Sequence, residues 1–343
     1  MLKMTLYPYE LPFRHPFTIS RHSKTVQPVL VVQLEDDTHY GLGETAANSY
    51  YQRTLANLIS DLEPIRPLLA QMTLDHPEDL WSRLYPHLSH NPFALCAIDQ
   101  AAWDLYAKKQ GRKLYEVWDL DPTHNPPTDY TIGIDTIERM VQKIKAFPWP
   151  VYKIKLGTDE DIPIIEALRK VTPAVFRVDA NCAWSLAQTI DNARKLRELG
   201  VEFIEQPMAD PGSDEGGWAE LKTAFEQSAL PLIADESCIV EGDVKKCKGH
   251  FHGINIKLTK CGGLTPALRM LKEARALGLR RMVGSMNEST VGSSAAAHLL
   301  PLLDYIDMDG PLLLAKDTAT GVRFNKGQII YADRPGTGAE LFA

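Results

Sequence analysis

The feature that most constrains the fold is a pattern that repeats eight times from residue 130 onward. In each repeat a short run of β-branched and aromatic residues ends in a polar residue, and an amphipathic stretch with helical spacing follows. The eight runs lie at residues 130–134, 151–156, 175–180, 203–206, 232–235, 254–258, 281–284 and 305–308. Their starts are separated by roughly 20–30 residues, which is the length of one strand–helix unit. Eight such units in succession predict an α/β fold with a closed (β/α)8-type barrel.

The segments on either side of the repeats follow other patterns. At the N-terminal side we predict strands at 4–8 and 29–35, a turn at 41–44, and helices at 54–69, 77–88 and 93–109. At the C-terminal side, residues 321–324 and 328–331 predict a β-hairpin around 325–327. We therefore expect an α+β capping domain over 1–115, the barrel over 125–315, and a tail over 316–343 that returns to the capping domain.

Composition narrows the class of protein. The net charge of −7 and the scattered basic residues argue against a nucleic acid as partner. No apolar run is long enough to cross a bilayer, and the N-terminus lacks a signal-peptide pattern, so we expect a cytoplasmic protein without a membrane partner. The five cysteines form no Cys-x-x-Cys pair, which favours free thiols over a zinc site. A homo-oligomer remains open.

Acidic residues stand at the ends of three consecutive runs, at Asp179, Glu205 and Asp235. Active-site groups of such barrels sit at the C-terminal ends of the strands, so these carboxylates are expected to converge. Three carboxylates make an oxygen shell that favours Mg²⁺, with Mn²⁺ as a substitute. Asn181 and Glu236 follow the ligands closely and are candidate supporting groups. The alternative for each acid alone is an isolated helix cap.

Lysines interrupt two of the apolar runs, at Lys153, Lys155 and Lys257. Lysine is almost never buried without a partner. Lys153 and Lys155 are two residues apart and therefore point to one side of a strand, the barrel interior. Lys257 belongs to the sixth run, so the three acids lie between the two lysine sites. This arrangement suits a metal site flanked by two bases that act on a carbon next to a carboxylate or amide carbonyl. We expect a divalent ion and a neighbouring ammonium to lower the lysine pKa. The alternative is that the lysines are counter-ions to the acids.

These residues stand in five motifs, which are Lys153-x-Lys155, Asp179-x-Asn181, Glu205-Gln206-Pro207, Asp235-Glu236-Ser237 and Lys257. Together they resemble the muconate-lactonizing subgroup of the enolase superfamily. The resemblance spans almost the whole chain, and it implies a barrel with a capping domain and a metal-stabilised enolate. It leaves the reaction open, because the subgroup includes muconate cycloisomerases, o-succinylbenzoate synthases, N-acylamino acid racemases and dipeptide epimerases.

The eighth run offers a way to choose among these reactions. Asp307 and Asp309 resemble the Asp-x-Asp motif of dipeptide epimerases, in which both acids bind the substrate ammonium. The resemblance implies a dipeptide that is inverted at the Cα of its C-terminal residue, with Lys155 and Lys257 exchanging the proton from opposite faces and Lys153 beside them. The alternatives are an o-succinylbenzoate synthase or N-acylamino acid racemase, a barrel that binds a ligand without catalysis, and, for the acid pair, a solvated or helix-capping role.

Substrate preference is expected to come from two candidate lid loops, at 20–24 and 48–53. Arg21 and Lys24 suit an acidic side chain, which would fit L-Ala-D/L-Glu and the recycling of murein peptides. The same residues fit a solvated loop equally well. Thr131, on the first run, is a further candidate for substrate contact.

Overall fold

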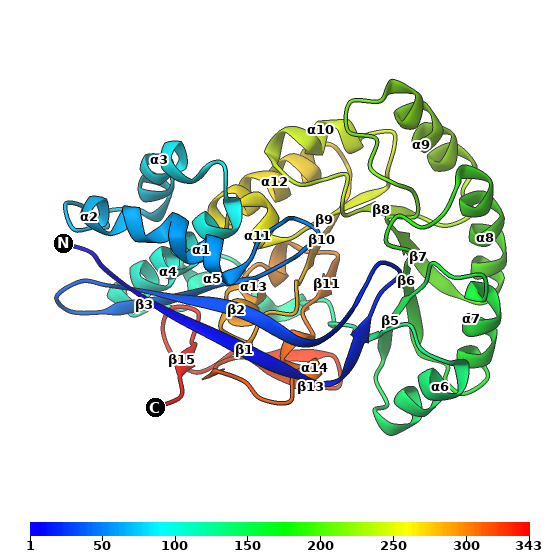
Figure 1. Ribbon diagram of the computed structural model, residues 1–343, viewed down its shortest axis with the longest axis horizontal. Helices are drawn as coiled ribbons and strands as arrows, with labels where there is room; N and C mark the ends of the chain where they lie inside the picture. Colours follow the sequence, from blue (N-terminus) through cyan, green and yellow to red (C-terminus); the bar gives the residue numbers. More distant parts are fainter.

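The computed structural model describes residues 1–343, and its centre is an eight-stranded parallel sheet in the order β11-β10-β9-β8-β7-β6-β5-β4. The strands are β4 (Tyr130–Ile132), β5 (Val151–Lys155), β6 (Val175–Asp179), β7 (Val201–Glu205), β8 (Leu232–Ala234), β9 (Gly253–Ile256), β10 (Arg280–Gly284) and β11 (Tyr305–Asp307). Each predicted run overlaps one of these strands, so the predicted barrel is confirmed (Figure 1).

The barrel is closed between β11 and the residues around β4 by a few contacts. Thr128 and Ile306 form an isolated parallel bridge. The Thr128 hydroxyl accepts a hydrogen bond from the Met308 backbone N–H at 3.0 Å. The Asp309 carboxylate accepts one from the Thr131 N–H at 2.5 Å. Strand ends that carry candidate site residues therefore also form this seam.

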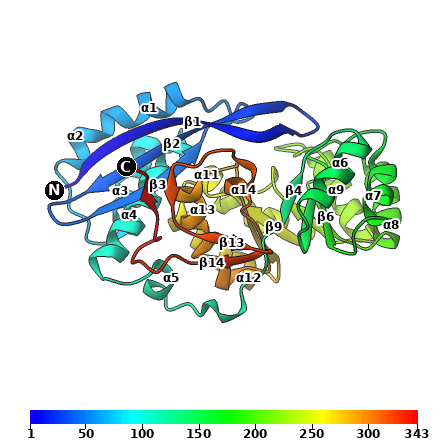
Figure 2. The same ribbon diagram turned by 90° about the horizontal axis from the view of Figure 1, so that it is seen from below.

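The helices around the barrel differ in their exposure to solvent between one side and the other. The helices that follow the strands are α6 (Ile137–Ala146), α7 (Asp161–Arg169), α8 (Leu186–Glu198), α9 (Glu215–Gln227), α10 (Val244–Cys247), α11 (Leu258–Cys261), α12 (Leu264–Ala276), α13 (Thr290–Ala297) and α14 (Gly310–Leu313). Helices α6 to α9 keep an exposed face, whereas every residue of α11 and α13 is buried. Figure 2 shows the reason for this difference. The N-terminal sheet lies across the side of the barrel that carries α11 and α13, and it does not cover α6 to α9.

The N-terminal part is a three-stranded antiparallel sheet with helices, built from β1 (Lys3–Thr18), β2 (Ser23–Glu35) and β3 (Tyr40–Ala46). Its helices are α1 (Leu55–Leu62), α2 (Arg66–Leu69), α3 (Pro77–Leu88), α4 (Pro92–Lys109) and α5 (Leu114–Val117). The predicted helix at 54–69 is divided into α1 and α2 by a 3-10 turn, Glu63–Ile65, which contains Pro64. Proline lacks the N–H that a continuous helix needs.

The turn predicted at 41–44 is wrong, because these residues lie inside β3. Gly41 and Gly43 serve close packing instead. A Cβ at Gly41 would lie 2.1 Å from the carbonyl oxygen of Ala101, and one at Gly43 would lie 2.1 Å from that of Ala97. The two glycines thus let α4 approach the sheet closely.

The C-terminal tail contains the predicted hairpin as β13 (Arg323–Asn325) and β14 (Gln328–Ile330). It also contains β12 (Ala319–Thr320), which pairs with β15 (Glu340–Leu341). Thr337 then contacts α4, where its N–H donates to the Asp104 carboxylate at 2.6 Å. No helix has both the length and the apolar character needed to cross a membrane.

Candidate active site

Strand register places one candidate residue from each of three neighbouring strands at the same level of the barrel. Lys155 on β5 is level with Asp179 on β6, and Asp179 is level with Glu205 on β7. Side chains alternate along a strand, so residues two positions earlier form the next layer of the interior. Phe203 and Ile233 lie in that earlier layer, in an apolar cluster with Met282 and Tyr305. Lys153 and Arg177 are level with each other in the same earlier layer, so charged and apolar side chains lie together beneath the C-terminal ends of the strands.

Eleven of the thirteen residues singled out from the sequence line one pocket at this end of the barrel. The pocket residues are Arg21, Lys24, Thr131, Lys153, Lys155, Asn181, Asp235, Glu236, Lys257, Asp307 and Asp309. Asp179 and Glu205 are fully buried next to the pocket, where Lys153 bridges them.

On the β5 side, two lysines share one carboxylate oxygen. The Lys155 Nζ donates to Oδ2 of Asp179 at 2.6 Å, and the Lys153 Nζ lies 3.2 Å from the same atom. Lys153 also lies 2.8 Å from Oε2 of Glu205 and 2.9 Å from Oδ2 of Asp307. The other Asp179 oxygen, Oδ1, accepts the Asn181 N–H at 2.9 Å. Lys153 is thus the cation that joins three acids from three strands.

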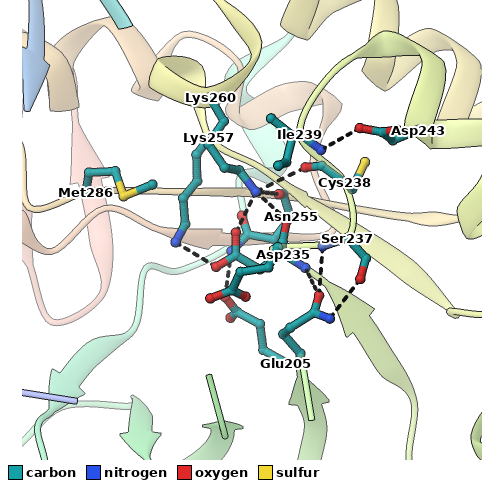
Figure 3. A network of polar contacts seen from close by, with 12 residues as sticks. Glu205, Asp235, Ser237, Cys238, Ile239, Asp243, Asn255, Lys257, Lys260 and Met286 are labelled. Atoms are coloured by element: carbon teal, nitrogen blue, oxygen red, sulfur yellow. Dashed lines mark hydrogen bonds and ion pairs between the residues drawn. The ribbon is translucent and has the colours of Figure 1, made fainter. Parts of the chain in front are cut away.

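On the β9 side, Asp235 lies between two lysines (Figure 3). The Lys257 Nζ donates to Oδ2 at 2.8 Å, and the Lys260 Nζ donates to Oδ1 at 2.6 Å. The side-chain amide of Asn255 donates to Oε1 of Glu205 at 2.9 Å. Both candidate bases are therefore ion-paired to a candidate metal ligand, in keeping with a counter-ion role.

The pKa values of Lys153 and Lys257 are raised in the protein alone, whereas we expected a bound divalent ion to lower them. Burial favours the neutral form of Lys153, but the carboxylates of Asp307, Glu205 and Asp179 outweigh it and raise the pKa of Lys153 above its ordinary value. Burial likewise opposes the charge on Lys257, and Asp235 outweighs it, so the pKa of Lys257 is raised. The expectation of lowered values placed a divalent cation beside the lysines, whereas in the protein alone the carboxylates dominate the field.

Asp307 and Asp309 occupy different positions although they are two residues apart. Asp307 uses Oδ2 to bind Lys153, and its Oδ1 is buried without a hydrogen-bond partner. Asp309 binds the Thr131 N–H at the seam of the barrel. Burial and the neighbouring Asp307 raise the pKa of Asp309 to about 7. Both acids line the pocket, and Asp307 carries a buried carboxylate oxygen without a hydrogen-bond partner.

The 20–24 loop reaches over the pocket and is fastened to the barrel. The Arg21 Nη2 lies 2.6 Å from Oε1 of Glu236, and its guanidinium sits 4.1 Å from the ring centre of Tyr50 in the second lid loop. Lys24 forms no ion pair and donates to Oε1 of Gln27 at 3.3 Å. Burial, followed by the charge of Lys257, lowers the pKa of Lys24.

Comparison with known proteins identifies the family. Residues 135–342 match the family model "Enolase C-terminal domain-like", and residues 2–118 match "Mandelate racemase / muconate lactonizing enzyme, N-terminal domain". The chain belongs to the enolase superfamily. The membership predicted from its motifs is therefore confirmed.

Relatives within the superfamily are similar over their whole length. The L-Ala-D/L-amino acid epimerase of Flavobacterium johnsoniae is 54% identical over 99% of this chain and 100% of its own. A substrate-liganded L-Ala-D/L-Glu epimerase from Bacillus subtilis superimposes with a TM-score of 0.91, at 27% identity over 98% of each chain. A dipeptide epimerase from Enterococcus faecalis, complexed with Mg and L-Leu-L-Tyr, superimposes with a TM-score of 0.91, at 28% identity over 98% of this chain and 99% of its own.

The donor set of this superfamily member fits a hard divalent cation. No group of three or more His, Cys, Asp or Glu side chains is arranged around a metal position as it stands, since lysine ammonium groups hold the acids. The three carboxylates are nevertheless buried, and burial followed by the charge of Asp179 raises the pKa of Glu205 to about 7. Oδ1 of Asn181 and Oε2 of Glu236 are buried without a hydrogen-bond partner beside them. A cation with oxygen ligands satisfies all of these groups.

Sequence reasoning missed three polar residues that hold the site together. Lys260 binds Asp235, and Asn255 binds Glu205. Gln206 is fully buried, and its amide oxygen accepts the backbone N–H of Asp235 and Ser237 at 2.8 and 3.2 Å. Gln206 thereby ties the end of β7 to the end of β8. The available signal for Lys260 was its position three residues after Lys257, on the short helix α11.

Proposed function

We propose that this chain is a dipeptide epimerase, an isomerase that inverts the Cα of the C-terminal residue of a dipeptide. The observation that carries the proposal is the placement of two lysines in one pocket on strands β5 and β9, with the three acids on or beside the strands between them. The three relatives described above are named as epimerases, which supports the same reaction.

The chain's own residues have complementary roles in this proposal. Lys155 and Lys257 act as base and acid on opposite faces of the substrate, so one removes the α-proton and the other supplies one. Lys153 holds Asp179, Glu205 and Asp307 in place through its three ion pairs. Asp179, Glu205 and Asp235 would hold Mg²⁺, or Mn²⁺ in its place. The bound cation supplies positive charge where negative charge develops on the substrate carboxylate.

A dipeptide is favoured over an N-acylated substrate because of Asp307. Its Oδ1 is buried, unpaired and next to the pocket, so it requires a hydrogen-bond donor. The free ammonium of a dipeptide provides one, whereas an acylated nitrogen or an o-succinylbenzoate precursor carries no such cation. Asp309 supports this subsite from the seam, and Thr131 holds Asp309.

The side chain at the inverted residue faces the lid loops in this proposal. The Arg21 charge is already paired with Glu236, whereas Lys24 is a half-buried ammonium without a carboxylate partner. Lys24 is therefore the better candidate for an acidic side chain such as Glu, and Arg21 closes the lid. A division into parts 1–115, 125–315 and 316–343, a cytoplasmic location, a role in murein peptide recycling and a possible homo-oligomer remain predictions from the sequence.

The test is a dipeptide library incubated with the enzyme and Mg²⁺ in deuterated water. Each substrate should gain one deuterium at the C-terminal Cα, as seen by mass spectrometry, and should yield its epimer. If no dipeptide exchanges, the proposal fails. Full activity on an N-acylamino acid after Asp307→Asn together with Asp309→Asn would favour the racemase alternative. A barrel that only binds its ligand would keep its role after Lys155→Ala with Lys257→Ala.

A further inference from the structure

Each of the two proposed bases is held by a carboxylate that a second lysine also holds. Lys155 and Lys153 share Asp179, at 2.6 and 3.2 Å from its Oδ2. Lys257 and Lys260 share Asp235, at 2.8 Å from Oδ2 and 2.6 Å from Oδ1. The roles proposed above use Lys153 but leave Lys260 without a function.

Lys260 is one of the most completely buried cations of the molecule. Its side chain has no exposed surface, and it is not among the residues that line the pocket. Besides Asp235 Oδ1, its Nζ donates to the backbone carbonyl oxygens of Asp235 and of Cys238, the latter at 3.0 Å. Figure 3 shows Lys257 and Lys260 approaching Asp235 from the same stretch of chain. Lys260 therefore touches neither substrate nor pocket, and it reaches the chemistry through Asp235.

The segment that carries Lys260 is fixed by the N-terminal part. The indole N–H of Trp81 donates to the Gly262 carbonyl oxygen at 2.9 Å, directly after α11. The next residue, Gly263, has a φ of +119°, and a Cβ there would lie 2.3 Å from Oδ2 of Asp99. A segment held this tightly delivers its ammonium to one fixed point.

We infer that Lys260 is a positioning residue which acts through Asp235 on Lys257, and thereby supports proton transfer on one face of the substrate only. This inference rests on the proposed roles of Lys155 and Lys257. In one direction the neutral amine of Lys257 takes the α-proton and becomes an ammonium, while the ammonium of Lys155 gives its proton to the opposite face and becomes neutral. Lys260 holds Oδ1 and the backbone carbonyl of Asp235. It thereby fixes the orientation of Oδ2, which lies 2.8 Å from the Lys257 Nζ.

The test measures solvent deuterium exchange at each epimer separately, by proton NMR, with L-Ala-L-Glu and L-Ala-D-Glu as probes. Lys155→Ala leaves exchange by Lys257 alone, and Lys257→Ala leaves exchange by Lys155 alone. Adding Lys260→Met to Lys155→Ala should lower the remaining exchange by about 100-fold or more, the usual contribution of a positioned acid or base. Adding it to Lys257→Ala should change exchange by no more than about twofold, as for a substitution away from the reacting group.

Lys108→Met is the matched control, because Lys108 lies 2.7 Å from Asp104 in an ion pair on α4, away from the pocket. It should leave exchange on both faces unchanged. Lys260→Arg should recover part of the loss, since it keeps the cation. Thermal melting checks folding, and calorimetric Mg²⁺ titration of the substrate-free Lys260→Met variant should show binding no weaker than wild type. If Lys260→Met does not fold, Lys260→Gln takes the same test.

Two results overturn the inference. Equal losses on the two faces, with weaker Mg²⁺ binding, would assign Lys260 to the metal site as a whole. Unchanged exchange in both backgrounds would leave it without an effect on catalysis. If the Lys155→Ala and Lys257→Ala variants do not retain exchange at one epimer each, the proposed bases are wrong, and the inference about Lys260 falls with them.

Discussion

At each strand end that carries a proposed base, two lysines bind one carboxylate, but the two ends position these lysines differently. At the end of β5, Lys153 and Lys155 stand two residues apart on one strand and approach one oxygen of Asp179. At the end of β9, Lys257 lies at the strand end and Lys260 lies on α11, and each takes its own oxygen of Asp235. Lys153 and Lys155 meet because side chains two residues apart on a strand point the same way. Lys257 and Lys260 meet because residues three apart lie on the same face of a helical turn.

The surroundings of the two ends differ as well. Helices α6 and α7, which flank β5, keep exposed faces, while α11 is completely buried against α4. The β5 side thus depends on the barrel itself, and the β9 side depends on the N-terminal part. The two proposed bases are both lysines, but different parts of the molecule hold them in place. Variants on one side should therefore affect proton transfer on one face of the substrate more than on the other.

The largest effect is expected from removal of the metal, and it should not separate the two sides. Asp179, Glu205 and Asp235 would hold the divalent cation, and its positive charge would assist proton removal by either lysine. Dialysis against EDTA should lower exchange at both epimers by about 1,000-fold or more, for the several kcal/mol that such a cation supplies. Added Mg²⁺ should restore it, with Mn²⁺ as a substitute. Unequal losses at the two epimers would contradict a shared cation.

Substitution of one lysine should separate the sides most clearly. Lys155→Ala and Lys257→Ala should each lower the rate of inversion by about 100-fold to 10,000-fold, because each removes one acid–base group. Each variant should retain solvent exchange at a single epimer, and the retained epimer should differ between the two. Chiral chromatography measures inversion and NMR measures exchange. Exchange at both epimers in either variant would show that one base serves both faces.

Asp307, at the end of β11, and Asp309, just after it, test whether the β5 side also binds the substrate. Asp307→Asn removes the charge that pairs with Lys153 and, in our proposal, with the substrate ammonium. Loss of one partner of a buried charge pair costs about 2–5 kcal/mol, so the KM for L-Ala-L-Glu should rise about 30-fold or more.

Asp309→Asn is the matched comparison for that prediction. An amide oxygen can still accept the Thr131 N–H, so its effect on KM should be smaller than that of Asp307→Asn. An N-acetylated dipeptide, which lacks the ammonium, should show no difference in KM between wild type and Asp307→Asn. Equal effects of the two substitutions on KM would instead show that both acids bind the ammonium, as the resemblance implies.

The sequence predicted the fold and the site where local pattern and position coincide. All eight strands were predicted, because each run overlaps a largely buried strand, and several of these strands carry a charged residue at or next to the active-site end. Lys153 and Lys155 were found because two residues on a strand point the same way. Lys260 was missed because it lies three residues beyond Lys257, where the chain changes from strand to helix and a strand pattern no longer applies.

Contacts between segments far apart in the sequence could not be predicted from local pattern. Gly41 and Gly43 suggest a turn locally, but α4 packs against them. Arg21 suggested a binding site for an acidic substrate, and the structure pairs it with Glu236 across 215 residues of chain. Asp309 is placed by the seam to Thr131, which exists only once the barrel has closed.

The smallest effect is expected at Asp99, which tests the support of the β9 side by α4. Its carboxylate accepts the N–H and hydroxyl of Thr265 at 2.8 and 2.6 Å, at the start of α12. Asp99→Asn replaces one acceptor oxygen by a donor, which should cost about 1–3 kcal/mol of unfolding free energy. Exchange by Lys257 should fall more than exchange by Lys155, although by far less than in the lysine variants.

The cost of Asp99→Asn should also depend on pH. Burial raises the pKa of Asp99 to about 7, from 3.8 in an exposed chain. Between these two pKa values, Asp99 stays protonated in the folded protein and loses its proton in the unfolded chain. The contribution of this proton to stability is therefore complete below pH 4 and is lost as the pH rises through 7. Asparagine does not titrate. The difference in unfolding free energy between wild type and Asp99→Asn, measured by urea denaturation, should therefore shrink between pH 5 and pH 8. A difference that stays constant between pH 5 and pH 8 would show that Asp99 is ionised in the folded protein throughout, with its hydrogen bonds to Thr265 outweighing its burial.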